Sequence, residues 1–182
     1  PELVVDIETQ DGQHQVILEN TTSEINAEMQ AIIDELLAEF EKHIQEGAGC
    51  KELIVKNELL ITTPEYFTLK LSCYQGEASG YTQEHFYTIS LISKERLQLK
   101  DIFIENADYI NIISENIKEQ MRNQMAQDES IYYWLEDEMD ELNFKTISEK
   151  TSFYINERDN VVICFNQGEV AAMYMGGVEF EI

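Results

Sequence analysis

The stretch Phe153-Tyr-Ile-Asn-Glu-Arg-Asp-Asn-Val-Val-Ile-Cys-Phe165 decides the fold of the C-terminal end of the chain. Two largely apolar runs flank the charged turn 157–160, and this pattern predicts two strands joined by a tight hairpin. Further on, Val178-Glu-Phe-Glu-Ile182 alternates apolar and acidic residues, as a strand with one buried face does. The chain is therefore expected to close with three strands.

The segment between the second and third of these strands breaks the rule that loops are polar. It reads Asn166-Gln-Gly-Glu-Val-Ala-Ala-Met-Tyr-Met-Gly-Gly177 and holds the apolar run 171–175 between glycines. An apolar run in a loop is either packed into the core or offered to a partner. Tyr and Met are residue types that anchor interfaces. At least one of Met173 and Met175 is instead expected to close the end of the sheet.

Hairpins and helices alternate along the rest of the chain. Strands are predicted at 3–8, 13–19, 52–61, 66–74 and 84–92, and shorter helices at about 108–127 and 129–142. Hairpin-linked strands interrupted by helices predict an α+β fold, with a mostly antiparallel sheet and helices packed on one face. A boundary near residue 80 divides an N-terminal subdomain, 1–80, from a C-terminal subdomain, 81–182. The two are expected to form one compact unit.

The longest helix is expected to open at the capping-box pattern Thr21-Thr-Ser-Glu24 and to end at Gly47-Ala-Gly49. Its apolar residues recur at helical spacing, with acidic residues on the other face, so the apolar stripe is expected to pack on the sheet. The residues of this stripe are Ile25, Met29, Ile32, Ile33, Leu36, Leu37, Phe40 and Ile44.

The charge of the chain limits its partners. Against 12 Lys and Arg stand 36 Asp and Glu, so the formal net charge is -24. Such a field repels nucleic-acid phosphates and anionic lipid surfaces, and it steers cationic partners to the protein. The same acidity is also what keeps many proteins soluble. With 43% hydrophobic and 26% charged residues the chain is expected to be globular.

The N-terminus of the chain and its three cysteines are less informative about fold and function. The sequence begins at Pro1, so we expect a piece of a longer protein, and it holds no apolar run of membrane-spanning length. Cys50, Cys73 and Cys164 are widely spaced without a CxxC pair, which argues against structural zinc. Cys164, within an apolar strand, is expected to be a buried thiol, and a disulfide between Cys50 and Cys73 is left open.

No constellation of catalytic residues stands out. The acidic cluster 136–141 would place paired carboxylates on one face of a helix, which favours a solvated face over a cation site. His14, His43 and His85 belong to no metal or nucleophile motif, and the glycine pairs are not phosphate loops. We therefore predict no enzyme activity, no metal and no cofactor. An enzyme that uses the acidic helix remains an alternative.

Two blocks of the sequence resemble the RsiV-type extracellular domain. Phe86-Tyr-Thr-Ile-Ser-Leu-Ile-Ser-Lys-Glu-Arg-Leu-Gln-Leu-Lys-Asp-Ile-Phe103 is similar to that family's strand–turn block, which ends leucine-x-leucine-x-aspartate-leucine-phenylalanine. The tail from Phe153 to Gly176 resembles its closing block, where a glutamate, an aliphatic residue, alanine, proline, any residue and tyrosine precede a glycine. Members of the family are the exported part of anti-sigma factors of extracytoplasmic-function sigma factors, and related domains sit beside peptidoglycan deacetylase domains.

The resemblance implies an extracellular sensor of envelope stress, held at the membrane by an upstream helix outside this chain. A sigma factor would be bound only by a segment that is also absent. The best-understood branch binds c-type lysozyme, so a basic protein of that kind is the expected ligand, bound through loops 76–83 and 168–177. The residues expected at this surface are Ser79, Tyr81, Ala172, Met173, Tyr174 and Met175.

Within this set, the family's tyrosine falls on Tyr174 and its serine near Ser79. Its proline is Ala172 here, which would leave the loop less preorganised. The competing hypothesis is a cell-wall-associated module that binds peptidoglycan. In that case Tyr66, Tyr74 and Tyr87 would stack on sugars from an open face of the sheet.

Overall fold

The computed structural model describes residues 4–9, 12–17, 19–47, 52–76, 80–135 and 141–182, with side chains described from Thr21 onward. Its helices and antiparallel sheets confirm the predicted α+β class. The chain folds into two compact units. The first comprises Pro1–Tyr81 and His85–Leu97, and the second comprises Thr82–Glu84 and Gln98–Ile182. Each unit is described by itself, and the predicted boundary near residue 80 stays a prediction.

The first unit begins with the antiparallel pair β1 (Val4–Thr9) and β2 (Gly12–Ile17), as predicted, and continues into α1 (Glu19–Glu46). The prediction that 21–24 opens this helix is wrong, because α1 already includes these residues. Thr21 is buried, and its hydroxyl donates to the carbonyl oxygen of Lys94 at 2.5 Å instead of capping the helix. The helix ends as predicted, at Gly47, whose φ of +66° suits a residue without a Cβ.

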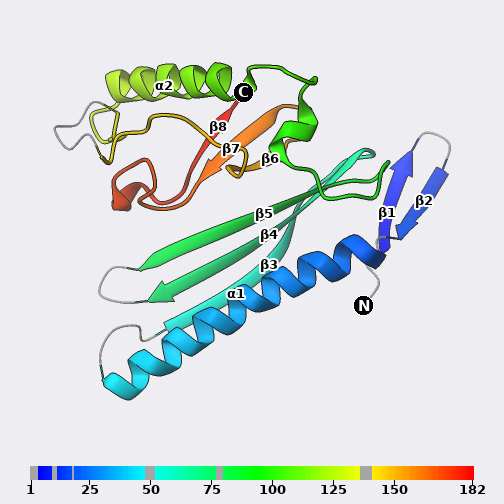
Figure 1. The fold of residues 1–182 in the computed structure, drawn as a ribbon, viewed down its shortest axis with the longest axis horizontal. Coiled ribbons are helices and arrows are strands. Elements are labelled where there is room, and N and C mark those ends of the chain that lie inside the picture. Colours follow the sequence, from blue (N-terminus) through cyan, green and yellow to red (C-terminus); the bar gives the residue numbers. More distant parts are fainter. Residues whose placement is uncertain (1–3, 10–11, 18, 48–51, 77–79, 136–140) are drawn as a thin grey trace. The chain divides into compact units, whose positions relative to one another are not determined.

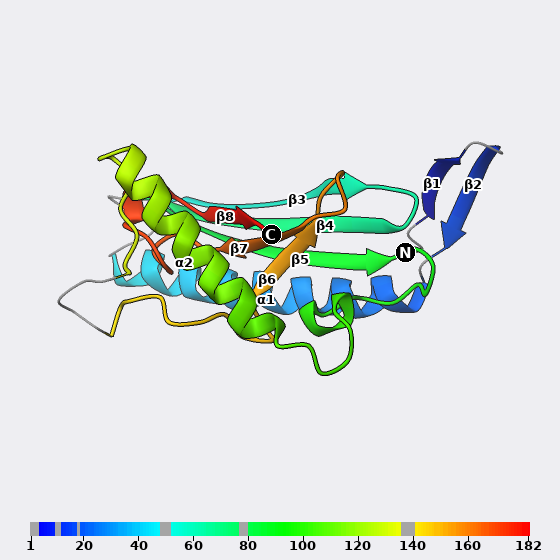
Figure 2. The same cartoon turned by 90° about the horizontal axis from the view of Figure 1, so that it is seen from above.

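The first unit also holds a three-stranded sheet, in the order β3 (Glu52–Thr62), β4 (Tyr66–Gly76) and β5 (Tyr81–Ser90). Within β5, only Thr82–Glu84 are grouped with the second unit. The helix α1 runs along one face of this sheet (Figures 1 and 2). Alternate residues of the strands meet the helix, since successive side chains point to opposite faces. The core they form is made of Ile25, Met29, Leu36, Phe67, Leu71, Cys73, Tyr87, Ile89 and Leu91.

Not all of the predicted helix stripe reaches this core. Leu37 and Ile44 are exposed, and Ile33 is half-buried. The prediction that the whole stripe packs on the sheet is therefore wrong for its outer edge. The sheet has only three strands, so it covers a narrower sector of α1 than the spacing of apolar residues suggests.

In the second unit, the 3-10 turn η1 (Leu99–Ile102) leads to α2 (Tyr109–Gln127). The strands β6 (Ser152–Ile155), β7 (Val161–Phe165) and β8 (Val178–Glu181) form an antiparallel sheet in that order, as predicted for the tail. Figure 2 shows α2 crossing this sheet. The helix buries Ile113, Ile117 and Met121 in the core of the unit. Aromatic rings complete that core in the pairs Tyr133–Phe180, Phe165–Phe180 and Phe144–Phe165.

The second helix predicted at 129–142 is wrong for the residues that the structure describes, 129–135 and 141–142. Asp128 accepts hydrogen bonds from the backbone N–H and the hydroxyl of Ser130, at 2.8 and 2.7 Å, and so turns the chain. Tyr133 then forms an antiparallel bridge with Ala171. This pairing with a distant segment requires an extended backbone, which excludes a helix there. Residues 136–140, most of the predicted acidic helix face, lie outside the described residues.

Within the described part of the chain, no helix combines the length and apolarity that a membrane crossing requires. Cys73 and Cys164 are buried thiols outside any disulfide, which confirms the prediction for Cys164. Burial raises the pKa of the Cys73 thiol. Cys50 lies outside the described residues.

Candidate partner-binding surface

The loop between β7 and β8 has a defined backbone conformation, with a 3-10 turn between two glycines. We call residues 168–177 the closing loop. Gly168 and Gly176 take φ values of +75° and +71°, which non-glycine residues rarely adopt. Between them, η2 (Met173–Met175) is closed by N–H donors of Met175 and Gly176, which reach the carbonyl oxygens of Ala172 and Met173 at 2.9 and 3.2 Å. A Cβ on Gly168 would also overlap Met173 Sδ, so a larger residue there would have to displace the Met173 side chain.

The apolar run of the closing loop divides between core and surface. Ala171 is buried, Ala172 and Met175 are half-buried, and Met173 and Tyr174 are exposed, at 45% and 69% of their surface. The sequence left open whether the run is packed inside or offered to a partner. In the structure Ala171, the first residue of the run, is packed in the core, whereas Met173 and Tyr174 are exposed to solvent.

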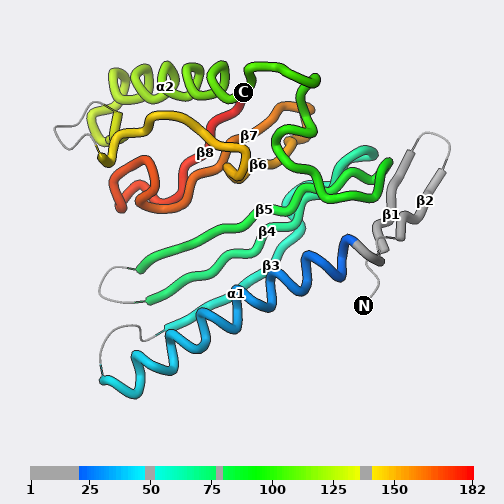
Figure 3. The backbone as a smooth tube through the Cα atoms, viewed as in Figure 1, coloured from blue at the N-terminus to red at the C-terminus, as the bar shows by residue number. Residues whose placement is uncertain are grey.

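An extended segment, residues 130–134, lies beside the closing loop and pairs with it (Figure 3). The Trp134 N–H donates to the Val170 carbonyl at 2.9 Å, and the Ala172 N–H donates to the Tyr132 carbonyl at 3.1 Å. At the tip, the Tyr174 hydroxyl donates to the Ser130 carbonyl at 2.8 Å. The exposed tyrosine is therefore fixed at both ends, by its own backbone and by its hydroxyl.

The backbone of Ala172 lies where proline would place it. Its φ of −59° and ψ of 141° match the values that proline prefers. The N–H that proline lacks is used here, in the hydrogen bond to Tyr132. The position thus has the conformation of the family's proline, but a hydrogen bond holds it in place of a ring.

Two side chains just before the closing loop connect it to another part of the second unit. Gln167 donates from Nε2 to the Met173 carbonyl at 2.8 Å, and its Oε1 accepts the Thr82 N–H at 2.9 Å. Asn166 Oδ1 accepts the Glu84 N–H at 2.6 Å. One amide group thus joins the segment Thr82–Glu84 to the tip of the closing loop. The sequence offered no signal for this role beyond two amides beside a glycine.

The two residues predicted from the first loop do not belong to the described part of the second unit, so their place in the contact surface stays a prediction. Ser79 lies outside the described residues. Tyr81 is half-buried at the start of β5 and belongs to the first unit. A Cβ on Gly80 would overlap the Tyr74 ring, so glycine is required for this close approach. The four residues predicted from the closing loop, Ala172 to Met175, are contiguous on η2 and its cap.

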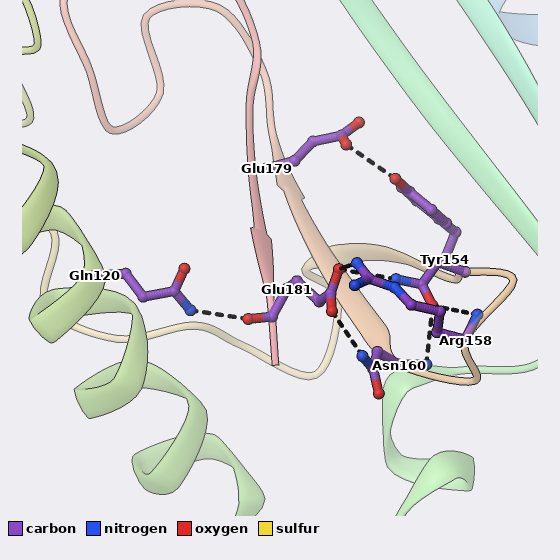
Figure 4. A network of polar contacts seen from close by, with 7 residues as sticks. Gln120, Tyr154, Arg158, Asn160, Glu179 and Glu181 are labelled. Atoms are coloured by element: carbon purple, nitrogen blue, oxygen red, sulfur yellow. Dashed lines mark hydrogen bonds and ion pairs between the residues drawn. The ribbon is translucent and has the colours of Figure 1, made fainter.

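A polar network fixes β8, the strand into which the closing loop runs (Figure 4). The Glu181 carboxylate accepts from Asn160 Nδ2 at 2.6 Å and forms an ion pair with Arg158, and the Glu181 carbonyl accepts from Gln120 Nε2 at 2.9 Å. Next to it, the Tyr154 hydroxyl donates to Glu179 at 2.9 Å. Burial, with the Glu179 carboxylate beside it, raises the pKa of Tyr154. The network links the β6–β7 turn and α2 to the last strand.

The sugar-binding site predicted from the sequence does not form, and most of the predicted acidic site lies outside the described residues. Tyr87 is fully buried between the sheet and α1, with the Arg96 guanidinium 4.7 Å from its ring centroid. It therefore shares no open face with Tyr66 and Tyr74, and the predicted sugar-stacking trio is wrong. No group of three metal-ligating side chains occurs among the described residues, a set that omits 136–140. Burial lowers the pKa of His85, so the neutral imidazole is favoured.

Each unit combines a helix with an antiparallel sheet, and the candidate contact surface is a loop of the second unit with an exposed, hydrogen-bonded tyrosine. Comparison with known proteins gives this description a family. Residues 100–182 match the family described as "Protein of unknown function (DUF3298)". The chain is 42% identical over 125 residues to the anti-sigma-V factor RsiV of Bacillus subtilis strain 168. That match covers 69% of this chain and 43% of RsiV, so the chain spans less than half of that relative's length.

The fold itself has a counterpart among solved structures. A member of the DUF3298 family from Bacteroides fragilis NCTC 9343 superposes with a TM-score of 0.57, covering 100% of this chain and 88% of its own. At 13% identity this likeness concerns the fold alone. The matches to RsiV and to the DUF3298 family confirm the resemblance inferred from the sequence. The chain is an RsiV-type domain.

Proposed function

We propose that this chain is the sensor domain of an anti-sigma factor and that it binds a basic protein, such as c-type lysozyme, through the closing loop. The relationship to an anti-sigma factor supports the first part. The observation that carries the second is Tyr174, which is 69% exposed yet held by a hydrogen bond to Ser130 at 2.8 Å. An exposed ring that is already immobilised loses little conformational entropy on binding.

Charge supports a basic ligand. The formal net charge of -24 raises the rate at which a cationic protein meets the surface, and salt screens that attraction. An aromatic anchor that enters a pocket then supplies affinity that does not depend on salt. We therefore expect association to slow with ionic strength, while dissociation changes little.

The experiment is calorimetric titration of the purified domain with a c-type lysozyme at low and at moderate salt. Replacing Tyr174 by Ala is expected to weaken binding by about 2 kcal/mol, roughly thirtyfold. Ile112, an exposed residue of α2, provides a matched control, and its change to Ala is expected to leave affinity unchanged. If the titration at low salt gives no binding heat and the two proteins do not co-elute, lysozyme is refuted as the ligand.

The remaining parts of the proposal concern the whole protein. We expect the domain to lie outside the cell, anchored by an upstream helix, with a sigma-binding segment before it. Loop 76–83, including Ser79 and Tyr81, is expected to contribute to ligand contact. Binding would expose the anti-sigma factor to proteolysis. Adding lysozyme to cells that make the full-length protein is expected to shorten its lifetime, and an unchanged lifetime despite binding in solution would contradict this step.

A further inference from the structure

We infer that Tyr132 is a second aromatic anchor, so that the partner-binding surface combines the closing loop with the extended segment 130–134. This inference rests on the proposed function and extends its surface to a segment distant in sequence. The partner that fits is a protein with a cationic face, such as a basic hydrolase.

Backbone hydrogen bonds place Tyr132 beside the tip of the closing loop. Its N–H donates to Met175 Sδ at 3.2 Å, and its carbonyl accepts the Ala172 N–H at 3.1 Å. The backbone of Tyr132 therefore lies against both ends of η2, the turn that carries Met173 and Tyr174. The Tyr174 hydroxyl reaches the carbonyl of Ser130, only two residues before Tyr132.

The side chain of Tyr132 points away from the core. Extended segments alternate their side chains, and here Tyr133 is the inward residue. It is buried, its ring lies 5.5 Å from that of Phe180, and its hydroxyl donates to Gln124 at 2.6 Å. Tyr132, by contrast, exposes 46% of its surface. Tyr132, Met173 and Tyr174 thus form an exposed apolar patch on two segments that hydrogen bonds hold together.

The two chain segments that carry the patch have acidic charges and no basic ones. Asp128, Glu129 and Glu169 are exposed at its ends, and neither 128–135 nor 166–182 contains a lysine or arginine. Hydrogen bonds from the Ser130 hydroxyl and N–H keep the pKa of Asp128 below its ordinary value, so this carboxylate stays charged. Tyrosine faces bordered by carboxylates attract lysine and arginine side chains, through charge and through cation–π contact. A second copy of this chain, with its own net charge of -24, would be repelled.

The test separates the ring of Tyr132 from the backbone that supports the loop. Because the hydrogen bonds from Tyr132 to Ala172 and Met175 use main-chain atoms, Tyr132→Ala is expected to retain them. Calorimetric titration with a c-type lysozyme at low salt should show affinity about tenfold weaker for Tyr132→Ala. Tyr132→Phe, which keeps the ring, should change affinity less than threefold. Near-ultraviolet circular dichroism checks that each variant is folded.

The outcomes distinguish this inference from the proposed function. If Tyr174→Ala weakens lysozyme binding but Tyr132→Ala matches the unchanged chain, the second anchor is refuted and the proposed function stands. If the unchanged chain does not bind lysozyme at all, both are refuted. A loss with Tyr132→Ala that Tyr132→Phe restores supports the second anchor. Glu129→Gln is expected to lower the association rate and its dependence on salt, as for a cationic partner.

Discussion

The amide of Gln167 offers the sharpest prediction about how the closing loop is held. Its Oε1 accepts the Thr82 N–H at 2.9 Å, and its Nε2 donates to the Met173 carbonyl at 2.8 Å. Each such bond contributes about 1 kcal/mol net. Gln167→Ala removes both, so the second unit is expected to lose about 2 kcal/mol of unfolding free energy. A Gln167→Glu carboxylate still accepts the Thr82 N–H but has no donor for Met173, so about 1 kcal/mol should be lost.

Two measurements read this out. Trp134, the single tryptophan of the chain, belongs to the second unit, so urea unfolding followed by its fluorescence reports on that unit alone. Amide hydrogen exchange at Thr82 reports on one bond. The Thr82 N–H is expected to exchange about fivefold faster in Gln167→Ala and at the original rate in Gln167→Glu. Unchanged Thr82 exchange in Gln167→Ala would refute the reasoning, whatever the effect on stability.

Three further predictions concern single residues. Ala172→Pro keeps φ near −59° but removes the hydrogen bond to Tyr132, so the two effects on stability should nearly cancel. The unfolding free energy, measured through Trp134 fluorescence, should change by less than about 1 kcal/mol. A loss of several kcal/mol would contradict this. Gly168→Ala should lower the unfolding free energy in chemical denaturation more than Gly47→Ala does. Both glycines have positive φ, but only at Gly168 would the added Cβ meet Met173 Sδ. Equal losses would show that the Met173 side chain moves away freely. Burial raises the pKa of Tyr87 from 10.0 to about 12, so its neutral form is favoured in the folded state. Its contribution to stability is complete below pH 10 and is lost between pH 10 and 12, at up to about 1.4 kcal/mol per pH unit. Ellipticity-monitored unfolding of Tyr87→Phe should show a shallower slope over this range, because Tyr154, whose pKa is also raised, still contributes. An identical slope in both proteins would refute the assignment.

Local patterns predicted most of the fold. The tail hairpin, for instance, was readable because apolar runs and the turn 157–160 act within a few residues. The errors arose where a distant partner decides the structure. Thr21 lies inside α1, and its hydroxyl is bound to Lys94, 73 residues away. The segment around Trp134 has apolar residues at helical spacing, yet its backbone pairs with the closing loop, which local propensity does not reveal.

The candidate surface was only partly readable from the sequence. Met173 and Tyr174 could be singled out because apolar residues in a loop need an explanation, and both are exposed. Gln167 and Tyr132 could not, since an amide and a tyrosine are common and their roles depend on hydrogen bonds to segments far along the chain. In each case the missing information is a pairing and not a residue type.

The way in which residue 132 holds the closing loop has a consequence for how such domains diverge. Because main-chain atoms of residue 132 make the hydrogen bonds to Ala172 and Met175, we expect these bonds to persist when the residue type at 132 changes. The chemistry displayed beside Tyr174 can therefore vary in evolution with little cost to folding. A lineage that meets a different ligand needs only to exchange this one side chain, and a library at position 132 offers an engineer the same route to new recognition.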